Sequence, residues 1–254
     1  MKKMLTTLAT LATLTTAANA DFIRVEAGTG MWNQKNVGFI SYDSDDISGK
    51  DTSKESELAT NYLWAYVKHP IPIVPNLRVE YSQIKSEGYF TGELKFGMAT
   101  LPYDGEDIPT TLEMTQIELI PYYNILDNTF WITVDLGLDI KLINYTATGS
   151  AVGKVDIYDE DGDFIAPLPY LRARTQLPFM NFGLEAVVKY GAMDGNTFSD
   201  INVKLDYTFD FIPLIQPGVE VGYRQIIMDA KSDDKKTVID LDFSGLYFGV
   251  MARF

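Results

Sequence analysis

Apolar residues recur at every second position over long stretches of the chain. Between Phe130 and Leu142 every even position is apolar, whereas the odd positions include Asp135, Asp139 and Lys141. Alternate side chains of a β-strand point to opposite faces of the sheet, so this pattern predicts strands with one apolar and one polar face. The same alternation recurs in four further segments: 77–81, 171–175, 182–190 and 201–209.

Several of these runs are longer than the five or six residues that are usual in soluble strands. A tilted strand needs about 9–11 residues to cross the hydrocarbon core of a bilayer. We therefore predict an all-β fold, a transmembrane antiparallel up-and-down β-barrel of ten strands. Eight or twelve strands remain alternatives, because residues 37–42 and 89–98 can be either strand or loop. The ten expected strands are 22–32, 58–68, 77–86, 112–123, 129–145, 164–177, 182–191, 198–210, 219–228 and 237–254.

Short and long connections alternate between these strands. Short periplasmic turns and long extracellular loops are typical of outer-membrane barrels, and an even number of strands returns both termini to the periplasmic side. The short connections, which are apolar or rich in proline, are 70–76, 125–128, 178–181 and 211–218. The connections expected to be extracellular, which are mostly longer and acidic, are 33–57, 87–111, 147–163, 192–197 and 229–236.

The first twenty residues resemble a signal for export. Residues 1–20 have two lysines directly after Met1, continue with an uncharged stretch and end in Ala18-Asn19-Ala20, which is typical of a cleaved signal peptide. We expect residues 21–254 to form one barrel domain in the bacterial outer membrane. A soluble secreted β-sandwich is the remaining alternative for the fold.

The C-terminal strand has apolar residues at alternate positions counted back from its last residue. This ending resembles the signal by which the barrel-assembly machinery recognises bacterial outer-membrane barrels, so that machinery is an expected partner. The residues of this signal are Leu246, Phe248, Val250, Ala252 and Phe254.

Three segments carry a resemblance to a known family. They are Gly28-Thr29-Gly30-Met31-Trp32-Asn33-Gln34, the segment HPIPIVPNLR at 69–78 and the segment YYNILDN at 122–128. Together with the C-terminal Phe254, they resemble a family of small Gram-negative outer-membrane β-barrel proteins without assigned function. The resemblance implies a fold and a location, and it supplies no catalytic residue.

The net charge of the chain limits the classes of molecule that it is expected to bind. The chain has a formal charge of −14 and no cysteine, and removal of residues 1–20 makes the charge −16 because two lysines are lost. An acidic protein is unsuited to nucleic acid, whose phosphates need clustered lysine and arginine. The expected partners are outer-membrane lipids and lipopolysaccharide, and we expect a monomer.

Charged residues of both signs point into the predicted barrel. Nine are basic and eight are acidic, and buried charges must be paired or hydrated, so their near balance predicts a narrow lumen crossed by salt bridges. Arg172, Arg174, Asp135 and Asp139 would act as gate residues in a channel. The basic residues are Arg24, Arg78, Lys141, Arg172, Arg174, Lys189, Lys204, Arg224 and Arg253. The acidic residues are Glu26, Glu80, Glu118, Asp135, Asp139, Glu185, Asp206 and Glu220.

Candidates for catalysis and metal binding are few. The single histidine, His69, enters a proline-rich periplasmic turn without an evident partner, so we expect no enzyme. Asp159, Asp161 and Asp163 have the spacing that opens a calcium loop, but Phe164 and Tyr170 depart from that motif. A solvated turn at Asp161-Gly162 is favoured. A divalent cation at the acidic loops is the one cofactor that the sequence leaves open.

These observations predict a non-enzymatic outer-membrane barrel with either a structural role or a restrictive channel for small solutes. The alternative is a surface-binding or adhesion protein that acts through acidic extracellular loops. A lipid-modifying or proteolytic enzyme is the least favoured function.

Overall fold

The computed structural model describes residues 23–43, 47–96, 99–129, 131–151, 155–177, 180–193, 195–210, 215–231 and 237–254. The strands are β1 (Arg24–Asp43), β2 (Ile47–Ser53), β3 (Glu57–Lys68), β4 (Asn76–Phe96), β5 (Ala99–Thr129), β6 (Ile132–Ala151), β7 (Val155–Gln176), β8 (Phe182–Met193), β9 (Asn196–Thr208), β10 (Gln216–Lys231) and β11 (Thr237–Arg253). In this part of the chain, no helix is long and apolar enough to cross a bilayer. The signal peptide predicted for residues 1–20 lies outside the described ranges.

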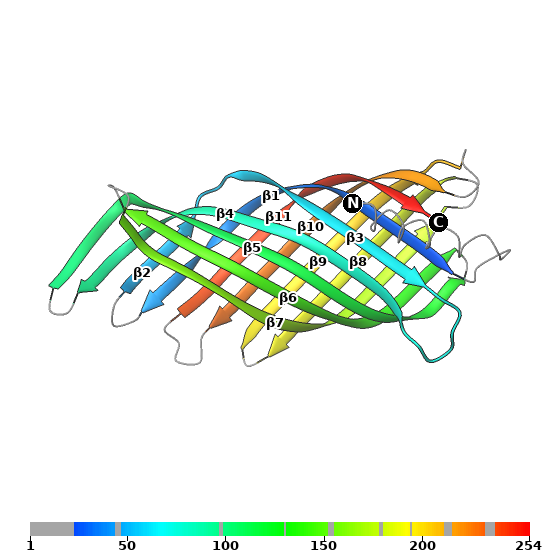
Figure 1. The fold of residues 1–254 in the computed structure, drawn as a ribbon, viewed down its shortest axis with the longest axis horizontal. Helices are drawn as coiled ribbons and strands as arrows, with labels where there is room; N and C mark the ends of the chain where they lie inside the picture. The colour runs from blue at the N-terminus through cyan, green and yellow to red at the C-terminus, as the bar shows by residue number, and fades with distance from the viewer. Residues whose placement is uncertain are drawn as a thin grey trace, which may run out of the picture.

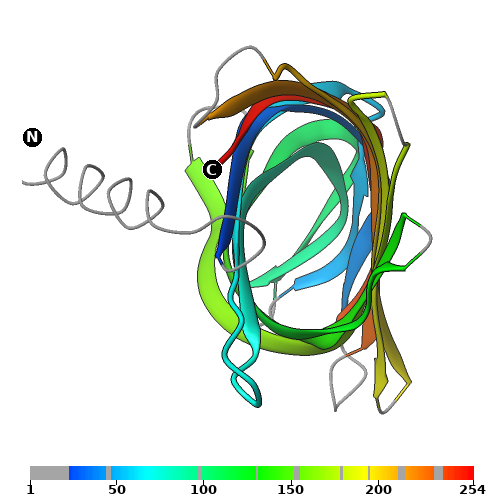
Figure 2. The same ribbon diagram turned by 90° about the vertical axis from the view of Figure 1, so that its right-hand side faces the viewer.

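The strands form one antiparallel sheet that closes into a barrel of oval cross-section (Figures 1 and 2). β2 and β3 follow each other along the chain and share one position between β1 and β4. β1 pairs with β11, from Glu26 opposite Arg253 to Tyr42 opposite Thr237, and this pairing closes the sheet. Because β2 and β3 act as one strand, the barrel has ten strands around its circumference, and the predicted ten-stranded barrel is confirmed.

The half of the barrel that holds both described chain ends has an apolar exterior. Val25 and Phe254 exchange backbone hydrogen bonds there. Outward side chains such as Leu136 and Leu184 are large, apolar and 53% and 47% exposed. An apolar outer wall of this kind faces lipid in a transmembrane barrel, so we call this the membrane half. We call the end of this half that holds Val25 and Phe254 the periplasmic end.

A row of polar residues marks the upper edge of the apolar exterior. The row crosses four neighbouring strands, on which outward residues lie opposite one another: Gln83, Thr115, Asn144 and Asp163. Beyond this row the outer face is polar, as shown by an exposed ion pair between Lys85 Nζ and Glu113 Oε1 at 2.7 Å. The strands continue past the row into the extracellular half of the barrel.

At the level of the polar row, where the outer wall changes from apolar to polar, the inner wall changes from mostly charged or polar to more apolar. In the membrane half the inward side chains are mostly charged or polar, and Asp135 and Glu185 are at most 3% exposed. At and beyond the polar row, inward side chains such as Ile84, Met114 and Phe243 form a buried apolar cluster. The extracellular half therefore has an apolar cluster inside, as a water-soluble β-barrel does, together with buried polar side chains such as Asn36 and Ser86.

The segments predicted as the three longest loops are largely strand, which corrects that prediction. Residues 33–57 continue β1 and contain β2, residues 87–111 extend β4 and β5, and residues 147–163 extend β6 and β7. Their acidic composition resembles that of loops because a strand beyond the membrane turns its outer face to water. The chain positions left open at 37–42 and 89–96 are also strand.

The short connections agree better with the sequence. β3 ends at Lys68 and β4 begins at Asn76, as the proline-rich turn at 70–76 predicts. The predicted turn at 125–128 is wrong, because β5 continues to Thr129 and the chain reverses at Trp131, which has a φ of 63°. Parts of the connections 178–181, 192–197, 211–218 and 229–236 lie outside the described ranges.

Candidate functional site

Eighteen charged side chains on the inner wall of the membrane half form one connected set of ion pairs, with nine basic and nine acidic members. We call this set the ionic network. Every member is buried except Arg24 at the periplasmic rim. The network consists of Arg24, Arg78, Lys141, Arg172, Arg174, Lys189, Lys204, Arg224 and Arg253 with Glu26, Glu80, Glu118, Asp135, Asp139, Glu185, Asp200, Asp206 and Glu220.

Glu185 on β8 is the central carboxylate of the ionic network. Its oxygens lie 3.2 Å from Arg78 Nη1, 2.8 Å from Arg172 Nη2, 3.4 Å from Arg174 Nη1 and 3.5 Å from Lys204 Nζ. These cations come from β4, β7 and β9, so one carboxylate joins strands on opposite sides of the barrel.

A second group of the ionic network lies nearer the extracellular half. Lys141 Nζ lies 2.7 Å from Asp200 Oδ2 and 3.0 Å from Glu118 Oε1. Lys189 also contacts Glu118, and Arg224 Nη2 lies 2.6 Å from Asp200 Oδ2. Each of these charges has an opposite charge within contact distance, which offsets the cost of removing it from water.

The periplasmic rim carries the third group. Arg253 Nε lies 2.7 Å from Glu26 Oε1, and Arg253 Nη2 lies 3.0 Å from Asp206 Oδ1. Arg174 forms a two-pronged contact with the same Asp206 through both of its terminal nitrogens. Arg24 contacts Glu26 from the rim at 2.5 Å. Side chains therefore hold the C-terminal strand to β1 and to β9, and backbone pairing holds it to β1 and β10.

The four residues predicted to gate a channel are all inside the barrel. Arg172 contacts Asp135 at 2.5 Å, and Arg174 is held at the rim. Asp139 lies 3.9 Å from Lys141, and neither of its carboxylate oxygens accepts a hydrogen bond within the described residues. Arg172 and Asp135 thus pair with each other, and Arg174 pairs with Asp206. Asp139 has the weakest contact of the four.

Asp200 is the one member of the ionic network that the sequence pattern missed. It occupies an even position in β9, in phase with Asn202, Lys204 and Asp206. The apolar alternation in this strand begins one residue later, at Ile201, so Asp200 fell outside the recognised run. Its inclusion changes nine charges against eight into nine against nine.

Interior aromatic residues were also missed, because the alternation pointed to charged residues alone. Tyr62 Oη donates a hydrogen bond to Glu220 Oε1 at 2.7 Å, and Trp64 Nε1 donates to the same oxygen at 2.9 Å. Lys204 Nζ lies 4.1 Å above the ring of Trp64, a cation–π contact. Gly28 permits this arrangement, since a Cβ at that position would come within 2.6 Å of the indole nitrogen.

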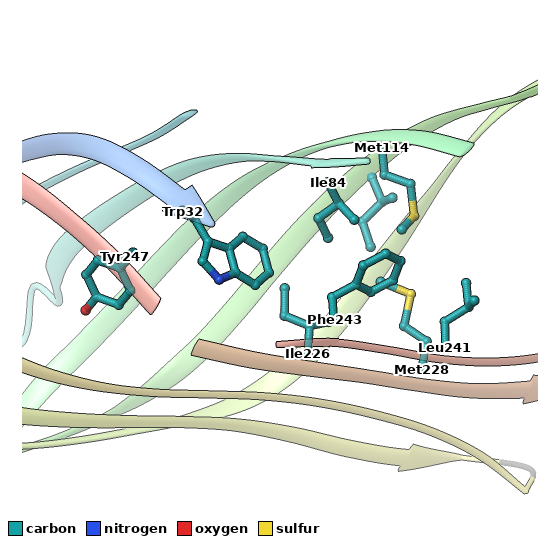
Figure 3. Close-up of a cluster of buried hydrophobic side chains, with 9 residues drawn as sticks. Trp32, Ile84, Met114, Ile226, Met228, Leu241, Phe243 and Tyr247 are labelled. Carbon is teal, nitrogen blue, oxygen red and sulfur yellow. The ribbon is translucent and has the colours of Figure 1, made fainter. Parts of the chain in front are cut away.

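An apolar cluster packs inside the barrel on the extracellular side of the ionic network, and we call it the apolar cap (Figure 3). Side chains from β4 and β5 meet side chains from β10 and β11 across the interior, and the indole of Trp32 lies beside them. The apolar cap consists of Trp32, Ile84, Met114, Ile143, Ile226, Met228, Leu241, Phe243 and Tyr247.

Two small cavities lie inside the barrel among the described residues. A cavity of about 30 Å³ lies between the ionic network and the apolar cap and is lined by residues that include Arg78, Arg224 and Trp32. A second cavity of about 10 Å³ lies further out, beside Asp51 and Leu241. One water molecule needs about 10–15 Å³ by this measure, so these cavities hold isolated waters at most.

His69 is used by the turn that contains it. Its Nδ1 accepts a hydrogen bond from the Ile71 backbone N–H at 3.2 Å. The other ring nitrogen, Nε2, therefore carries the proton and donates to the Pro75 carbonyl at 3.0 Å. The Asn76 side chain accepts a bond from the His69 backbone N–H. Both ring nitrogens have structural partners.

The predicted turn at Asp161-Gly162 is wrong, because both residues lie within β7. Asp161 and Asp163 are exposed there, and the side chain of Asp159 lies outside the described residues. Alternate residues of a strand are separated by about 6.6 Å, whereas a calcium loop must curl to bring its ligands together. No cluster of three metal-ligating side chains is present among the described residues.

The residues of the predicted assembly signal lie on the outer face of β11. Leu246, Phe248 and Val250 are large apolar residues that remain exposed there, and Phe254 follows the end of the strand. Ala252 lies opposite Ala27 of β1. This strand closes the barrel.

Comparisons with known proteins gave structural similarities only. No family model matches the chain, and no curated protein matches it. The outer membrane protease OmpT from Escherichia coli is 9% identical, with a TM-score of 0.47 over 91% of this chain and 96% of that chain. The translocator domain of the autotransporter NalP from Neisseria meningitidis is 12% identical, with a TM-score of 0.40 over 100% and 96%. Ail, the attachment invasion locus protein of Yersinia pestis, is 10% identical, with a TM-score of 0.36 over 91% and 99%.

The location of the protein follows from the barrel itself. The sheet closes on itself, and in the membrane half its outer wall is apolar where its inner wall is charged. Strands can cross a bilayer only as such a closed barrel, and single-chain barrels of this kind belong to outer membranes. The chain is an integral β-barrel protein of the bacterial outer membrane.

Proposed function

We propose that this protein is a non-enzymatic outer-membrane barrel with a sealed interior, which acts at the cell surface through its extracellular half. The observation that carries the proposal is the apolar cap, which lies on the extracellular side of an ionic network in which every charge has an ion-pair partner. Two barriers of opposite chemistry therefore stand in series along the barrel axis.

Each barrier opposes the passage of solutes for its own reason. Opening the ionic network would separate buried ion pairs such as Arg172–Asp135 and Lys141–Asp200. Leaving one partner of a buried pair uncompensated costs about 3–5 kcal/mol. An apolar constriction excludes water and hydrated ions by dewetting, and the apolar cap is such a constriction. This favours a structural interior over a restrictive channel.

The charge distribution directs attention to the outside. The ionic network is neutral, with nine charges of each sign, so the whole formal charge of −14 lies elsewhere in the chain. Exposed acidic residues of the extracellular half, such as Asp43, Asp161 and Asp163, contribute to it. A surface of this kind suits interaction with cationic partners.

Conductance in planar bilayers tests the sealed interior. We expect no discrete current steps from the purified barrel, provided that its folded state is verified in the same sample. A Phe243→Ala variant weakens the apolar cap, and an Arg172→Ala/Arg174→Ala variant weakens the ionic network. Each should stay silent because the other barrier remains. Steps from the unmodified protein whose ion selectivity changes in the double-arginine variant would instead establish a restrictive channel.

A further inference from the structure

The sheet has an open seam between β7 and β8, which begins just below the polar row and runs through the extracellular half. β7 pairs with β8 only from Tyr170 opposite Lys189 to Gln176 opposite Gly183. Beyond Tyr170, β7 continues to Val155, paired with β6 on its other side. Figure 1 shows the green β6–β7 hairpin reaching further towards the left-hand end than the yellow β8–β9 hairpin. Within the described residues, β7 from 155 to 169 has no strand partner at the seam.

The base of the seam is closed by side chains. Pro167 and Pro169 have no N–H to offer β8, so backbone pairing stops at this level. Leu168 packs there against Gly191 of β8, where an added Cβ would lie 2.7 Å from a Leu168 methyl group. The free edge of β7 therefore begins at about Ala166 and runs outward. We call residues 155–166 the β7 edge.

Two hydrogen bonds fix which backbone groups point to the seam. The Gln176 N–H donates to Trp131 on the β6 side, and the Leu177 N–H donates to Phe182 on the β8 side. Successive residues of an antiparallel strand alternate between their two neighbours, and the pairing of β6 with β7 has no irregularity from Thr175 to Tyr158. The N–H groups of odd residues, including Asp163 and Ile165, therefore point to the open seam.

The two faces of the β7 edge have different chemistry. Asp161 and Asp163 are exposed on the outer face. On the inner face, Phe164 is 41% exposed although it points into the barrel, and its ring packs only partly against Tyr145. A strand added at this edge would meet the carboxylates of Asp161 and Asp163 and the exposed side chain of Ile165 on its outer side, and aromatic surface on its inner side.

This surface selects against a second copy of the chain. Two β7 edges paired with each other would bring Asp161 and Asp163 of both copies together, and like charges on neighbouring strands are destabilising. Basic side chains at alternate positions would be favoured instead. Apolar side chains between them would cover Phe164.

We propose that the β7 edge binds an extended polypeptide segment with alternating basic and apolar residues, by addition of a strand to the sheet. Main-chain hydrogen bonds to Asp163 and Ile165 hold the segment, and the acidic and aromatic faces set its sequence preference. The inference rests on the proposed surface role and names the chemistry of its partner.

The test uses the full barrel in nanodiscs of zwitterionic lipid, with fluorescence anisotropy of a short capped peptide of alternating lysine and valine. Empty nanodiscs correct for binding to lipid. We expect binding to the barrel and none by a matched peptide of alternating glutamate and valine. Ile165→Pro removes one seam-facing N–H, whereas Ile165→Ala removes the side chain and keeps the N–H. Affinity should fall about fivefold or more in the proline variant and stay within about twofold in the alanine variant.

Charge reversal gives a second readout. In an Asp161→Lys/Asp163→Lys variant, preference should pass from the lysine peptide to the glutamate peptide. Equal affinity of the unmodified barrel and the Ile165→Pro variant overturns the proposal, as does dimerisation of the barrel that the proline variant abolishes. Loss of peptide binding overturns this inference alone, whereas conductance by the same preparation overturns the sealed interior alone.

Discussion

Glu185 shows how many side chains a single carboxylate can connect in the membrane half, where the interior is mostly charged or polar. It contacts Arg78, Arg172, Arg174 and Lys204, and it is buried. None of these contacts alone is strong evidence for stability, because each charge had to leave water. Removal of the shared carboxylate, however, leaves several cations underpaired at once.

We therefore expect Glu185→Gln to lower the free energy of unfolding by about 3–5 kcal/mol, the range for breaking a buried ion pair. Glu113→Gln is the matched control, because Glu113 pairs with Lys85 on the exposed outer face and such pairs contribute about 0–1 kcal/mol. Urea unfolding of both variants in lipid vesicles measures the difference. Similar losses in the two variants would show that the ionic network is no more important than a surface pair.

At the scale of the strand, the sequence predicted the membrane half well and the extracellular half poorly. Apolar alternation located the ten strands, and its polar phase located seventeen members of the ionic network. In β4 the apolar residues Leu77, Val79 and Tyr81 point outward, but Ile84 and Phe90 further along point inward. The period of two continues while the apolar phase changes, so a search for one continuous phase ends the strand at the polar row. Asp200 was missed because it precedes the recognised apolar run of β9, and the interior aromatic residues were missed because the search considered only charged residues between apolar ones.

The change of phase in β4 has a test in two neighbouring residues. Ile84→Lys places a charge inside the apolar cap and should lower the stability of the barrel by more than about 3 kcal/mol, because the cap has no partner for it. Gln83→Lys places the same charge on the outer face, in the polar row, and should change stability by less than about 0.5 kcal/mol. Chemical unfolding of the two variants decides. Equal, small effects would mean that this part of β4 is not packed as a strand.

At the scale of the whole molecule, the two ends of the barrel are distinguished by their connections and charge. The described chain ends and the proline-rich turn after Lys68 lie at one end, and the acidic strand extensions lie at the other. The chain contains no cysteine, so single cysteines report their own position without interference.

We expect Asp161→Cys to react with a membrane-impermeant thiol reagent in intact cells, because Asp161 lies on the exposed face of the extracellular half. Ile71→Cys, in the exposed periplasmic turn, should react only after the outer membrane has been permeabilised. Gel-shift labelling of both variants before and after permeabilisation measures their orientation. The reverse pattern would place the acidic extensions in the periplasm.

The exchange of apolar faces at the polar row limits how the gene for such a protein can change in length. Insertion or deletion of a single residue in a strand beside Gln83 would turn every later side chain to the other face. The apolar cap of that strand would then point outward, in line with the lipid-facing residues below it, and its charges would point inward. A single inserted or deleted residue would thus give that strand an outward apolar stretch longer than the bilayer can cover. Changes of length in these strands are tolerable in pairs, at the hairpin tips, or where a β-bulge absorbs them, as between Phe90 and Gly92 of β4.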